Sequence, residues 1–273
     1  MPKSIEELQA IAKRVRRDIV EMIYEAKSGH PGGSLSAVEI LVELYFDHMK
    51  VDPKNPKWPD RDRFILSKGH AAPVLYSVMA EAGYPDAPKD QLNTLRKFGS
   101  VFQGHPDMRF IPSLEASTGS LGEGLSLGLG MALAARLDSR PSRIYVMLGD
   151  GEIQEGQIWE AAMSGRFHKV DNIVAIVDFN RIQLDGFVKD IMEVEPLADK
   201  WRGFGWHTIE IDGHDLRAIQ AALEEAEATK GKPTCIVAHT VKGKGVSFME
   251  NNPKFHGVAP NKDEYQLAMK ELN

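Results

Sequence analysis

The run Ile144-Tyr-Val-Met-Leu148 leads without a break into the turn Gly149-Asp150-Gly151, and this stretch decides the fold. Its five consecutive apolar residues lack polar alternation, which is typical of a strand covered on both faces in a parallel sheet. Comparable runs occur at 64–66, 173–177, 207–211 and 235–238. Helix-like stretches lie between them, at 71–82, 122–137, 156–168 and 215–229. This alternation predicts an α/β protein of three layers, with an open, mostly parallel sheet and helices on both faces.

Two helices are predicted ahead of the first of these strands. Ser4 and Glu7 form an S-x-x-E capping box, and apolar residues then repeat at helical spacing as far as Ala26. A second helix is predicted over 34–49, because Leu35, Val38, Leu41 and Tyr45 share one face. The end of the chain adds a short helix just before Asn273.

Composition limits the classes of function. The chain has 273 residues and 42% hydrophobic content, enough for a large core, and one domain over 1–273 is the simplest organisation. The net charge of −6 leaves no basic stripe for nucleic acid, and no run of 18 apolar residues could cross a membrane. The single cysteine, Cys235, lies in an apolar run and is expected to be a buried, unpaired thiol. The polar start, Met1-Pro-Lys-Ser-Ile-Glu-Glu, lacks a signal core, so a cytoplasmic protein is expected.

Histidines next to glycines form a second pattern. Five of the nine histidines have a glycine neighbour: His30, His70, His105, His214 and His256. A glycine lets the backbone approach a ligand while the adjacent imidazole reaches it. For any single one of them, a surface loop or a hydrogen-bonded core position is the commoner explanation. Taken together, they predict a polar pocket with several hydrogen-bond donors.

Two strand ends predict a metal site. Asp150 follows the run 144–148, and Asn180 follows the run 173–177, one strand-helix-strand unit later. Ligands of open α/β sheets gather at the carboxyl ends of strands, so both side chains can point at one place. A simple Asp-Gly turn is the alternative for Asp150. A carboxylate, an amide oxygen and a loop carbonyl suit a hard cation such as Mg²⁺, which usually bridges to phosphate. The pattern therefore predicts a diphosphate ligand.

Six ordered motifs extend this pattern over most of the chain. They are Ser28-Gly-His-Pro-Gly-Gly-Ser34, Ser67-Lys-Gly-His70, Gly104-His-Pro106, Thr118-Gly-Ser-Leu-Gly122, Gly149-Asp-Gly-Glu-Ile-Gln-Glu-Gly156 and His256-Gly-Val-Ala-Pro260. The spaced pair of Gly149-Asp-Gly151 and Asn180 resembles the signature of thiamine diphosphate enzymes. The set of motifs, in this order, resembles the transketolase family from about residue 5 to 272. The resemblance implies a thiamine diphosphate-binding fold of the diphosphate-holding type.

The resemblance also implies the metal ligands. They would be Asp150, Asn180 and the main-chain carbonyl of Ile182, holding Mg²⁺, or Ca²⁺ or Mn²⁺ in its place, against thiamine diphosphate. The amide of Gly151 would donate to the diphosphate at a strand-to-helix turn, where unpaired N–H groups favour an anion.

The matching histidines would divide into two groups. His70 and His256 would contact the diphosphate or its surroundings. His30 and His105, with help from His256, would line the substrate channel, hydrogen-bond the ketose and move protons as catalytic residues.

The remaining matches would surround the cofactor. Leu121 would pack near the thiazolium ring, while Gly119 and Gly122 would let the backbone approach. Glu155 would meet its symmetry mate across a dimer interface next to the cofactor; a solvated glutamate at a helix start is the alternative. Lys242 would lie in a loop near the cofactor, with a solvated lysine pair as the alternative.

Transketolases are usually about twice this length, and a second domain holds the aminopyrimidine ring and supplies an activating glutamate. That domain has no counterpart in this sequence. The resemblance therefore implies a partner chain, the C-terminal transketolase subunit, in an α₂β₂ heterotetramer that acts on sugar phosphates, as in the pentose phosphate pathway. Three alternatives stay open: a subunit like 1-deoxyxylulose-5-phosphate synthase or 2-oxo acid dehydrogenase E1, a specialised transketolase-like enzyme for an unusual sugar, and a non-catalytic cofactor-binding partner.

Overall fold

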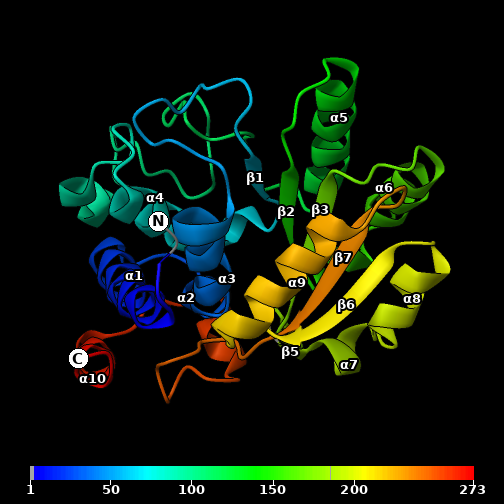
Figure 1. The fold of residues 1–273 in the computed structure, drawn as a ribbon. Helices are drawn as coiled ribbons and strands as arrows, with labels where there is room; N and C mark the ends of the chain where they lie inside the picture. Colours follow the sequence, from blue (N-terminus) through cyan, green and yellow to red (C-terminus); the bar gives the residue numbers. More distant parts are fainter. Residues whose placement is uncertain (1–2, 185) are drawn as a thin grey trace.

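A five-stranded sheet forms the centre of the computed structural model, which describes residues 3–184 and 186–273 (Figure 1). Met1, Pro2 and Asp185 belong to the predicted domain but lie outside the described residues. The strand order is β1-β2-β3-β7-β6, and every neighbouring pair is parallel. The strands are β1 (Arg63–Leu66), β2 (Ile144–Gly149), β3 (Ile173–Phe179), β6 (His207–Asp212) and β7 (Thr234–His239). All five predicted strands are therefore confirmed. β6 is an edge strand and is only partly buried.

Helices cover both faces of this sheet, as predicted. They are α1 (Ile5–Ala26), α2 (Pro31–Leu35), α3 (Val38–Glu43), α4 (Ala72–Ala82), α5 (Glu123–Leu137), α6 (Gly156–Phe167), α7 (Val188–Ile191), α8 (Leu197–Gly203), α9 (Leu216–Ala228) and α10 (Lys262–Glu271). A π-helical turn (Leu44–His48) follows α3, and short 3₁₀ turns occur at Gly69–Ala71, Lys89–Thr94, Glu152–Gln154 and Pro253–His256. The predicted capping box of Ser4 and Glu7 begins α1.

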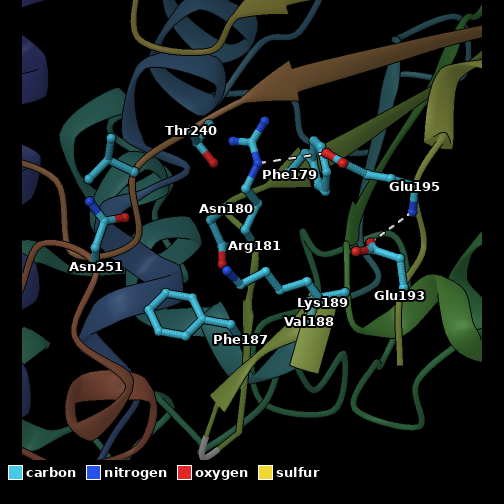
Figure 2. A pocket seen from close by; sticks show the side chains of 11 residues that line it. Phe179, Asn180, Arg181, Phe187, Val188, Lys189, Glu193, Glu195, Thr240 and Asn251 are labelled. Carbon is cyan, nitrogen blue, oxygen red and sulfur yellow. Dashed lines mark hydrogen bonds and ion pairs between the residues drawn. The ribbon is translucent and has the colours of Figure 1, made fainter. Parts of the chain in front are cut away.

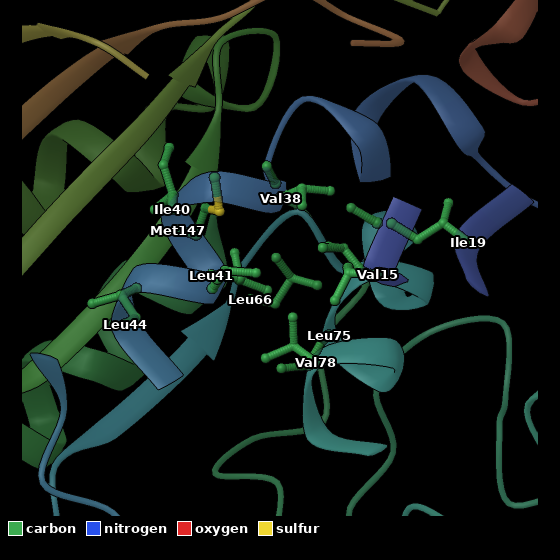
Figure 3. Close-up of a cluster of buried hydrophobic side chains, with 14 of the residues drawn as sticks. Val15, Ile19, Val38, Ile40, Leu41, Leu44, Leu66, Leu75, Val78 and Met147 are labelled. Atoms are coloured by element: carbon green, nitrogen blue, oxygen red, sulfur yellow. The ribbon is translucent and has the colours of Figure 1, made fainter. Parts of the chain in front are cut away.

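Alternate residues of the central strands enter two separate apolar clusters. Tyr145 and Met147 of β2 join the cluster formed with α1, α3, α4 and α9, part of which is drawn in Figure 3. Val146 and Leu148 join the cluster formed with α5, α6 and α8. Cys235 is buried in this second cluster as an unpaired thiol, as predicted. Because both faces of the strands are covered, their sequences lack polar alternation.

The single helix predicted over 34–49 is wrong. The segment instead forms α2, α3 and the π-helical turn. Ser36 lies at the break between α2 and α3, where its Oγ donates to the Gly33 carbonyl at 3.3 Å and to Asp178 Oδ2 at 2.7 Å. Serine hydroxyls that bond to nearby backbone compete with helix continuation, so an apolar period alone could not show this break.

Short elements between β3 and β6 were not predicted. They are the hairpin of β4 (Ile182–Gln183) and β5 (Gly186–Phe187), followed by α7 and α8. Elements of two to seven residues contain too few apolar positions to establish a period. Within the described residues, no helix has the length and apolar character needed to span a bilayer.

The order of strands reverses between β3 and β7. The chain passes from β1 to β2 to β3, crosses to the edge strand β6 and returns to β7, which pairs with β3. In open parallel sheets, ligands bind outside the carboxyl ends of the strands at such a reversal. The loops after β2, β3 and β7 therefore meet where a site is expected.

Candidate active site

A cavity of about 350 Å³ opens at the carboxyl edge of the sheet. Segments that follow β1, β2, β3 and β7 supply its walls, together with the start of α2 and the loops before α5 and α10. The predicted site residues that line it are His30, His70, His105, Gly119, Leu121, Asp150, Gly151, Glu155, Asn180, Ile182, Lys242 and His256. Gly122 is the predicted residue that does not line it. The six sequence motifs thus converge on one place.

The predicted metal ligands form a buried set of oxygen donors. Asp150 and Asn180 are 2% and 6% exposed. Asp150 Oδ1 accepts from the Gly151 amide at 2.8 Å, and its Oδ2 accepts from the Arg181 amide. Asn180 Oδ1 accepts from the Ile182 amide at 3.1 Å, so all three predicted ligands belong to one network. Burial, with the nearby Asp178 charge, raises the pKa of Asp150 to about 7.

This donor set fits a hard divalent cation. It consists of a carboxylate, an amide oxygen and a main-chain carbonyl, and Mg²⁺ prefers such oxygen ligands together with phosphate oxygens. Among residues 3–184 and 186–273, no group of three or more His, Cys, Asp or Glu side chains is arranged to hold a metal.

The turn after β2 leads into the helix predicted over 156–168 through a 3₁₀ turn. Gly151 is the N-cap of this turn (Glu152–Gln154), and α6 begins at Gly156 with Glu155 as its N-cap. The Gly151 amide, expected to be unpaired, donates to Asp150. Its contact with a diphosphate thus stays a prediction, and its hydrogen bond orients a predicted metal ligand.

Three imidazoles form a triangle in the cavity. The ring centroids of His30 and His70 lie 5.2 Å apart, those of His30 and His256 5.5 Å, and those of His70 and His256 5.3 Å. Burial lowers the pKa of His30 to about 4 and that of His256 to about 3, with nearby cations adding to both effects. Burial also holds the pKa of His70 well below its usual value. Neutral imidazoles can donate from one nitrogen and accept at the other.

His105 and Arg96 lie beside this triangle. Arg96 Nη1 donates to Ser28 Oγ at 2.8 Å, and its Nη2 lies 3.5 Å from His30 Nδ1. Burial, with the Arg96 charge, lowers the pKa of His105. Arg96 also has a φ of 59°, a left-handed conformation that is uncommon for a non-glycine residue. The guanidinium beside the histidines thus belongs to a residue, Arg96, with an unusual backbone conformation.

Lys242 is buried rather than solvated. The residue is 2% exposed, and its Nζ donates to the Ile182 carbonyl at 2.6 Å and lies 2.8 Å from His256 Nδ1. Burial lowers its pKa to about 8. The alternative of a solvated lysine pair is therefore wrong for Lys242. Its neighbour Lys244 is the partly exposed member and lies 3.8 Å from Glu250.

The glycine loop before α5 passes close to the site. Gly119 and Gly122 have φ values of 143° and 89°, where a side chain would be strained. A Cβ on Gly122 would lie 2.9 Å from Glu155 Cβ, so the missing side chain brings the two segments together. Leu121 is 40% exposed at the rim, and Glu155 is exposed as well. The roles of Leu121 and Glu155 stay predictions.

Three buried charged residues at the site were not predicted: Lys68, Glu152 and Asp178. Lys68 and Asp178 form an ion pair. Glu152 accepts from the amides of Gly122 at 3.1 Å and Gly149 at 2.8 Å. Each lies within or beside a motif, and charged residues rarely enter a core unless they are paired, so their place directly after apolar runs was the available signal.

His214 lies outside the cavity. Its Nδ1 contacts Glu39 at 2.9 Å, and its Nε2 accepts from the Val241 amide. Asp215, the next residue, caps α9 by accepting from the amides of Arg217 and Ala218. His214 was the one glycine-flanked histidine without a motif.

A second cavity of about 480 Å³ lies on the other side of Asn180 (Figure 2). Arg181, Lys189, Glu193 and Glu195 supply both charges to its lining, and Arg181 Nε lies 3.8 Å from Glu195. Most of these side chains are exposed. Asn180 therefore lines both cavities.

The fold and site define a class of α/β protein with a polar, histidine-lined cavity at the carboxyl edge of a parallel sheet. The family model described as "Transketolase, thiamine diphosphate binding domain" matches residues 8–273. The chain therefore belongs to the transketolase family and corresponds to its N-terminal, thiamine diphosphate-binding domain.

Known relatives fall into two length classes. A 6-deoxy-6-sulfo-D-fructose transketolase subunit from Clostridium sp. (strain MSTE9) is 46% identical, with 97% of this chain and 96% of the relative aligned. An apulose-4-phosphate transketolase subunit from Phocaeicola vulgatus is 42% identical over 98% of this chain and 95% of the relative. Transketolase from Mus musculus is 38% identical over 99% of this chain but only 42% of the relative.

The solved structures that match are also longer than this chain. Transketolase from Campylobacter jejuni superimposes with a TM-score of 0.93 at 34% identity, covering 99% of this chain and 43% of that structure. The chain thus spans about two fifths of the full-length transketolases that it matches.

Proposed function

We propose that this chain is the diphosphate-binding subunit of a two-chain transketolase. It would hold thiamine diphosphate through Mg²⁺ and contribute to moving a two-carbon ketol unit from a ketose phosphate to an aldose phosphate. The observation that carries the proposal is the meeting, in one cavity, of the Asp150, Asn180 and Ile182 oxygens with the triangle of histidines.

The residues of this chain would divide the work of binding. Asp150, Asn180 and the Ile182 carbonyl would hold Mg²⁺, which neutralises part of the diphosphate charge. Lys242, buried beside Ile182 and His256, would offset negative charge that remains. When bound, thiamine diphosphate supplies a nucleophilic carbon and an electron sink for carbon–carbon bond cleavage.

The histidines would handle the sugar. His30 and His256 are neutral at pH 7, because burial places their pKa values at about 4 and 3. Each can therefore donate to a ketose carbonyl or hydroxyl and can accept or return a proton as the bond is rearranged. His105, whose ring lies close to Gly119, would extend this sugar-binding surface toward the rim of the cavity.

Arg96 supports an anionic sugar as the substrate class. Its side chain contacts the Ser28 hydroxyl and the His30 ring, and neither group carries negative charge. The names of two relatives specify anionic sugars, a sulfonated fructose and apulose 4-phosphate. We therefore assign a ketose with a phosphate or sulfonate group, without choosing a pathway.

Exposed apolar surface supports assembly with other chains. Four large apolar side chains of α5 and α6 are exposed: Leu127 (42%), Leu137 (86%), Met163 (54%) and Phe167 (80%). Apolar surface of this kind marks interaction sites. We propose that α5 and α6 pack against a second copy, near Glu155, and that a pyrimidine-binding partner covers the cavity rim at Leu121 and Leu184. An α₂β₂ assembly in the cytoplasm follows as the prediction.

An activity assay tests the proposal. The purified chain is given a ketose phosphate, an aldose phosphate, thiamine diphosphate and Mg²⁺, with and without a partner that carries the pyrimidine-binding domain. We expect ketol transfer only with the partner, and full activity of this chain alone would overturn the two-chain assignment. The Asp150→Ala variant is the control that should be inactive in both mixtures. No turnover in any complex that binds the cofactor would favour a non-catalytic partner instead.

A further inference from the structure

Asp178, the penultimate residue of β3, contacts the predicted metal ligand Asn180. Its carboxylate is fully buried and is held by four side chains from four segments. Ser36 Oγ donates to Oδ2 at 2.7 Å, Asn180 Nδ2 donates to Oδ2 at 3.0 Å, Thr240 Oγ1 donates to Oδ1, and Lys68 forms an ion pair with Oδ2. Asn180 and Thr240 can be followed in Figure 2. A buried carboxylate with this many donors has a fixed position.

The bond from Asn180 determines which end of its amide faces the oxygen set. An ionised carboxylate only accepts hydrogen bonds, so Asp178 can bind the NH₂ end of Asn180 but not its oxygen. Asn180 Oδ1 is thereby turned to the opposite side, where it accepts from the Ile182 amide at 3.1 Å and keeps a second lone pair. A flipped amide would place its oxygen against the carboxylate and an NH₂ group among the metal ligands.

We propose that Asp178 is a positioning residue that fixes the orientation of the Asn180 amide, so that oxygen rather than nitrogen faces the divalent cation. Lys68 supports Asp178 in this role. It donates to the Gly33 carbonyl at 2.7 Å and balances the buried charge of Asp178. The inference rests on the proposed function, because it gives Asn180 the role of a metal ligand.

The size of the effect follows from known metal sites. Groups that orient metal ligands typically change metal affinity by about 10- to 100-fold when they are removed. Because Asp178 is also half of a buried ion pair, a single substitution would leave the Lys68 charge uncompensated and would destabilise the fold. The test therefore removes both charges and varies only the hydrogen-bond acceptor.

Two double variants form a matched pair, K68M/D178N and K68M/D178L. Both lack the ion pair, and the two replacements for Asp178 have similar size. The asparagine of K68M/D178N can still accept from Asn180 and can donate its own NH₂ to Thr240, whereas the leucine of K68M/D178L offers Asn180 no acceptor. Binding of Mn²⁺ in the presence of thiamine diphosphate is measured from the electron paramagnetic resonance signal of free Mn²⁺. Urea denaturation of both variants reports whether they fold equally well.

We expect K68M/D178N to bind Mn²⁺ about 10- to 100-fold more tightly than K68M/D178L. Equal Mn²⁺ affinity in the two folded variants would overturn the inference while leaving the proposed function intact. If the wild-type chain bound no Mn²⁺ with the cofactor, the proposed function would fail and the inference with it.

A measurement on the wild-type chain decides the case if K68M/D178L does not fold. In a chain labelled with ¹⁵N-asparagine, hydrogen exchange of the Asn180 side-chain NH₂ is compared with that of the exposed Asn251. The Asn180 signal is identified by its loss in the N180D variant. We expect exchange at Asn180 to be at least about tenfold slower, because its NH₂ is buried against a carboxylate. Equal exchange rates would overturn the inference.

Discussion

The histidines of this protein occupy two kinds of surroundings. In the cavity, His30, His70 and His256 lie against one another and near cations, and burial lowers the pKa of each. Outside it, four histidines each lie near a glutamate, at 3.5, 2.6, 2.9 and 3.3 Å: His48, His207, His214 and His239. Each outer histidine thus has a glutamate partner within the fold, and the inner three lie beside other imidazoles and cations instead.

This difference separates structural from functional histidines. A histidine paired with a carboxylate has its hydrogen bonds satisfied by the protein and stabilises the local fold. The neutral imidazoles of the cavity instead form a surface beside the cations Lys242 and Arg96. Such a surface suits an anionic ligand rich in oxygen, as the proposed cofactor and sugar are. Changes to residues of either group, and to the metal set beside them, test this contrast, from the largest effect to the smallest.

Asp150→Ala should remove metal-dependent cofactor binding, because it deletes the one carboxylate of the proposed metal set. We expect the affinity for thiamine diphosphate with Mg²⁺ to fall by at least about 100-fold. Isothermal titration calorimetry measures this, with Asp138→Ala, an exposed residue at the end of α5, as the matched control. Unchanged affinity in Asp150→Ala would mean that the metal set is assigned wrongly.

His30→Ala should reduce turnover more than cofactor affinity. Proton transfer by a positioned side chain contributes roughly 100-fold or more to rate, so kcat of the complete enzyme should fall by that order. His207→Ala, which removes an outer histidine paired with Glu225, should leave kcat nearly unchanged. The contrast between the inner and outer histidines would be contradicted if His30→Ala weakened cofactor binding and left kcat unchanged.

His214→Ala should act on stability instead. His214 accepts from the partly buried Val241 amide and contacts Glu39, which Arg16 also binds. Leaving such groups without a partner costs about 1–3 kcal/mol, so the free energy of unfolding in urea should fall by this amount. Cofactor affinity should change by a smaller amount, because His214 acts on the cofactor site only through the loop that carries Lys242. An unfolding free energy equal to that of the wild type would show that His214 stabilises nothing.

A pH-dependent effect concerns acid stability of the cofactor-free chain. The pKa of His30 is about 4 in the folded chain, below its ordinary value of 6.5. The unfolded chain therefore binds more protons, and the stability that a neutral His30 contributes above pH 6.5 is lost as pH falls toward 4. His30→Gln should flatten this part of the stability profile relative to the wild type. Parallel profiles of the two proteins, measured by urea denaturation, would contradict the lowered pKa of His30.

The sequence alone predicted the strands and the place of the cavity, because a single physical rule governs each of them. Apolar runs such as 144–148 predicted the strands, because burial on both faces removes alternation. Glycine-flanked histidines and the pair Asp150 and Asn180 predicted the cavity, because strand ends and turns place such groups at one edge.

The sequence could not reveal features that depend on contacts between distant segments. The break at Ser36 depends on its bond to Asp178, 142 residues away. Burial of Lys242 depends on the Ile182 carbonyl, and the ion pair of Lys68 with Asp178 joins the ends of two strands that are not neighbours. The paired amide of Gly151 likewise depends on the local turn after β2. Sequence patterns do not specify which residues form such contacts.

The most direct test of the central claim is a titration of this chain with three ligands, each with and without Mg²⁺. They are thiamine diphosphate, inorganic diphosphate and thiamine. If the cavity grips the diphosphate through a divalent cation, thiamine diphosphate should bind only with Mg²⁺, diphosphate should compete with it, and thiamine should bind at least about tenfold more weakly. Equal binding of thiamine and thiamine diphosphate, independent of Mg²⁺, would contradict the account.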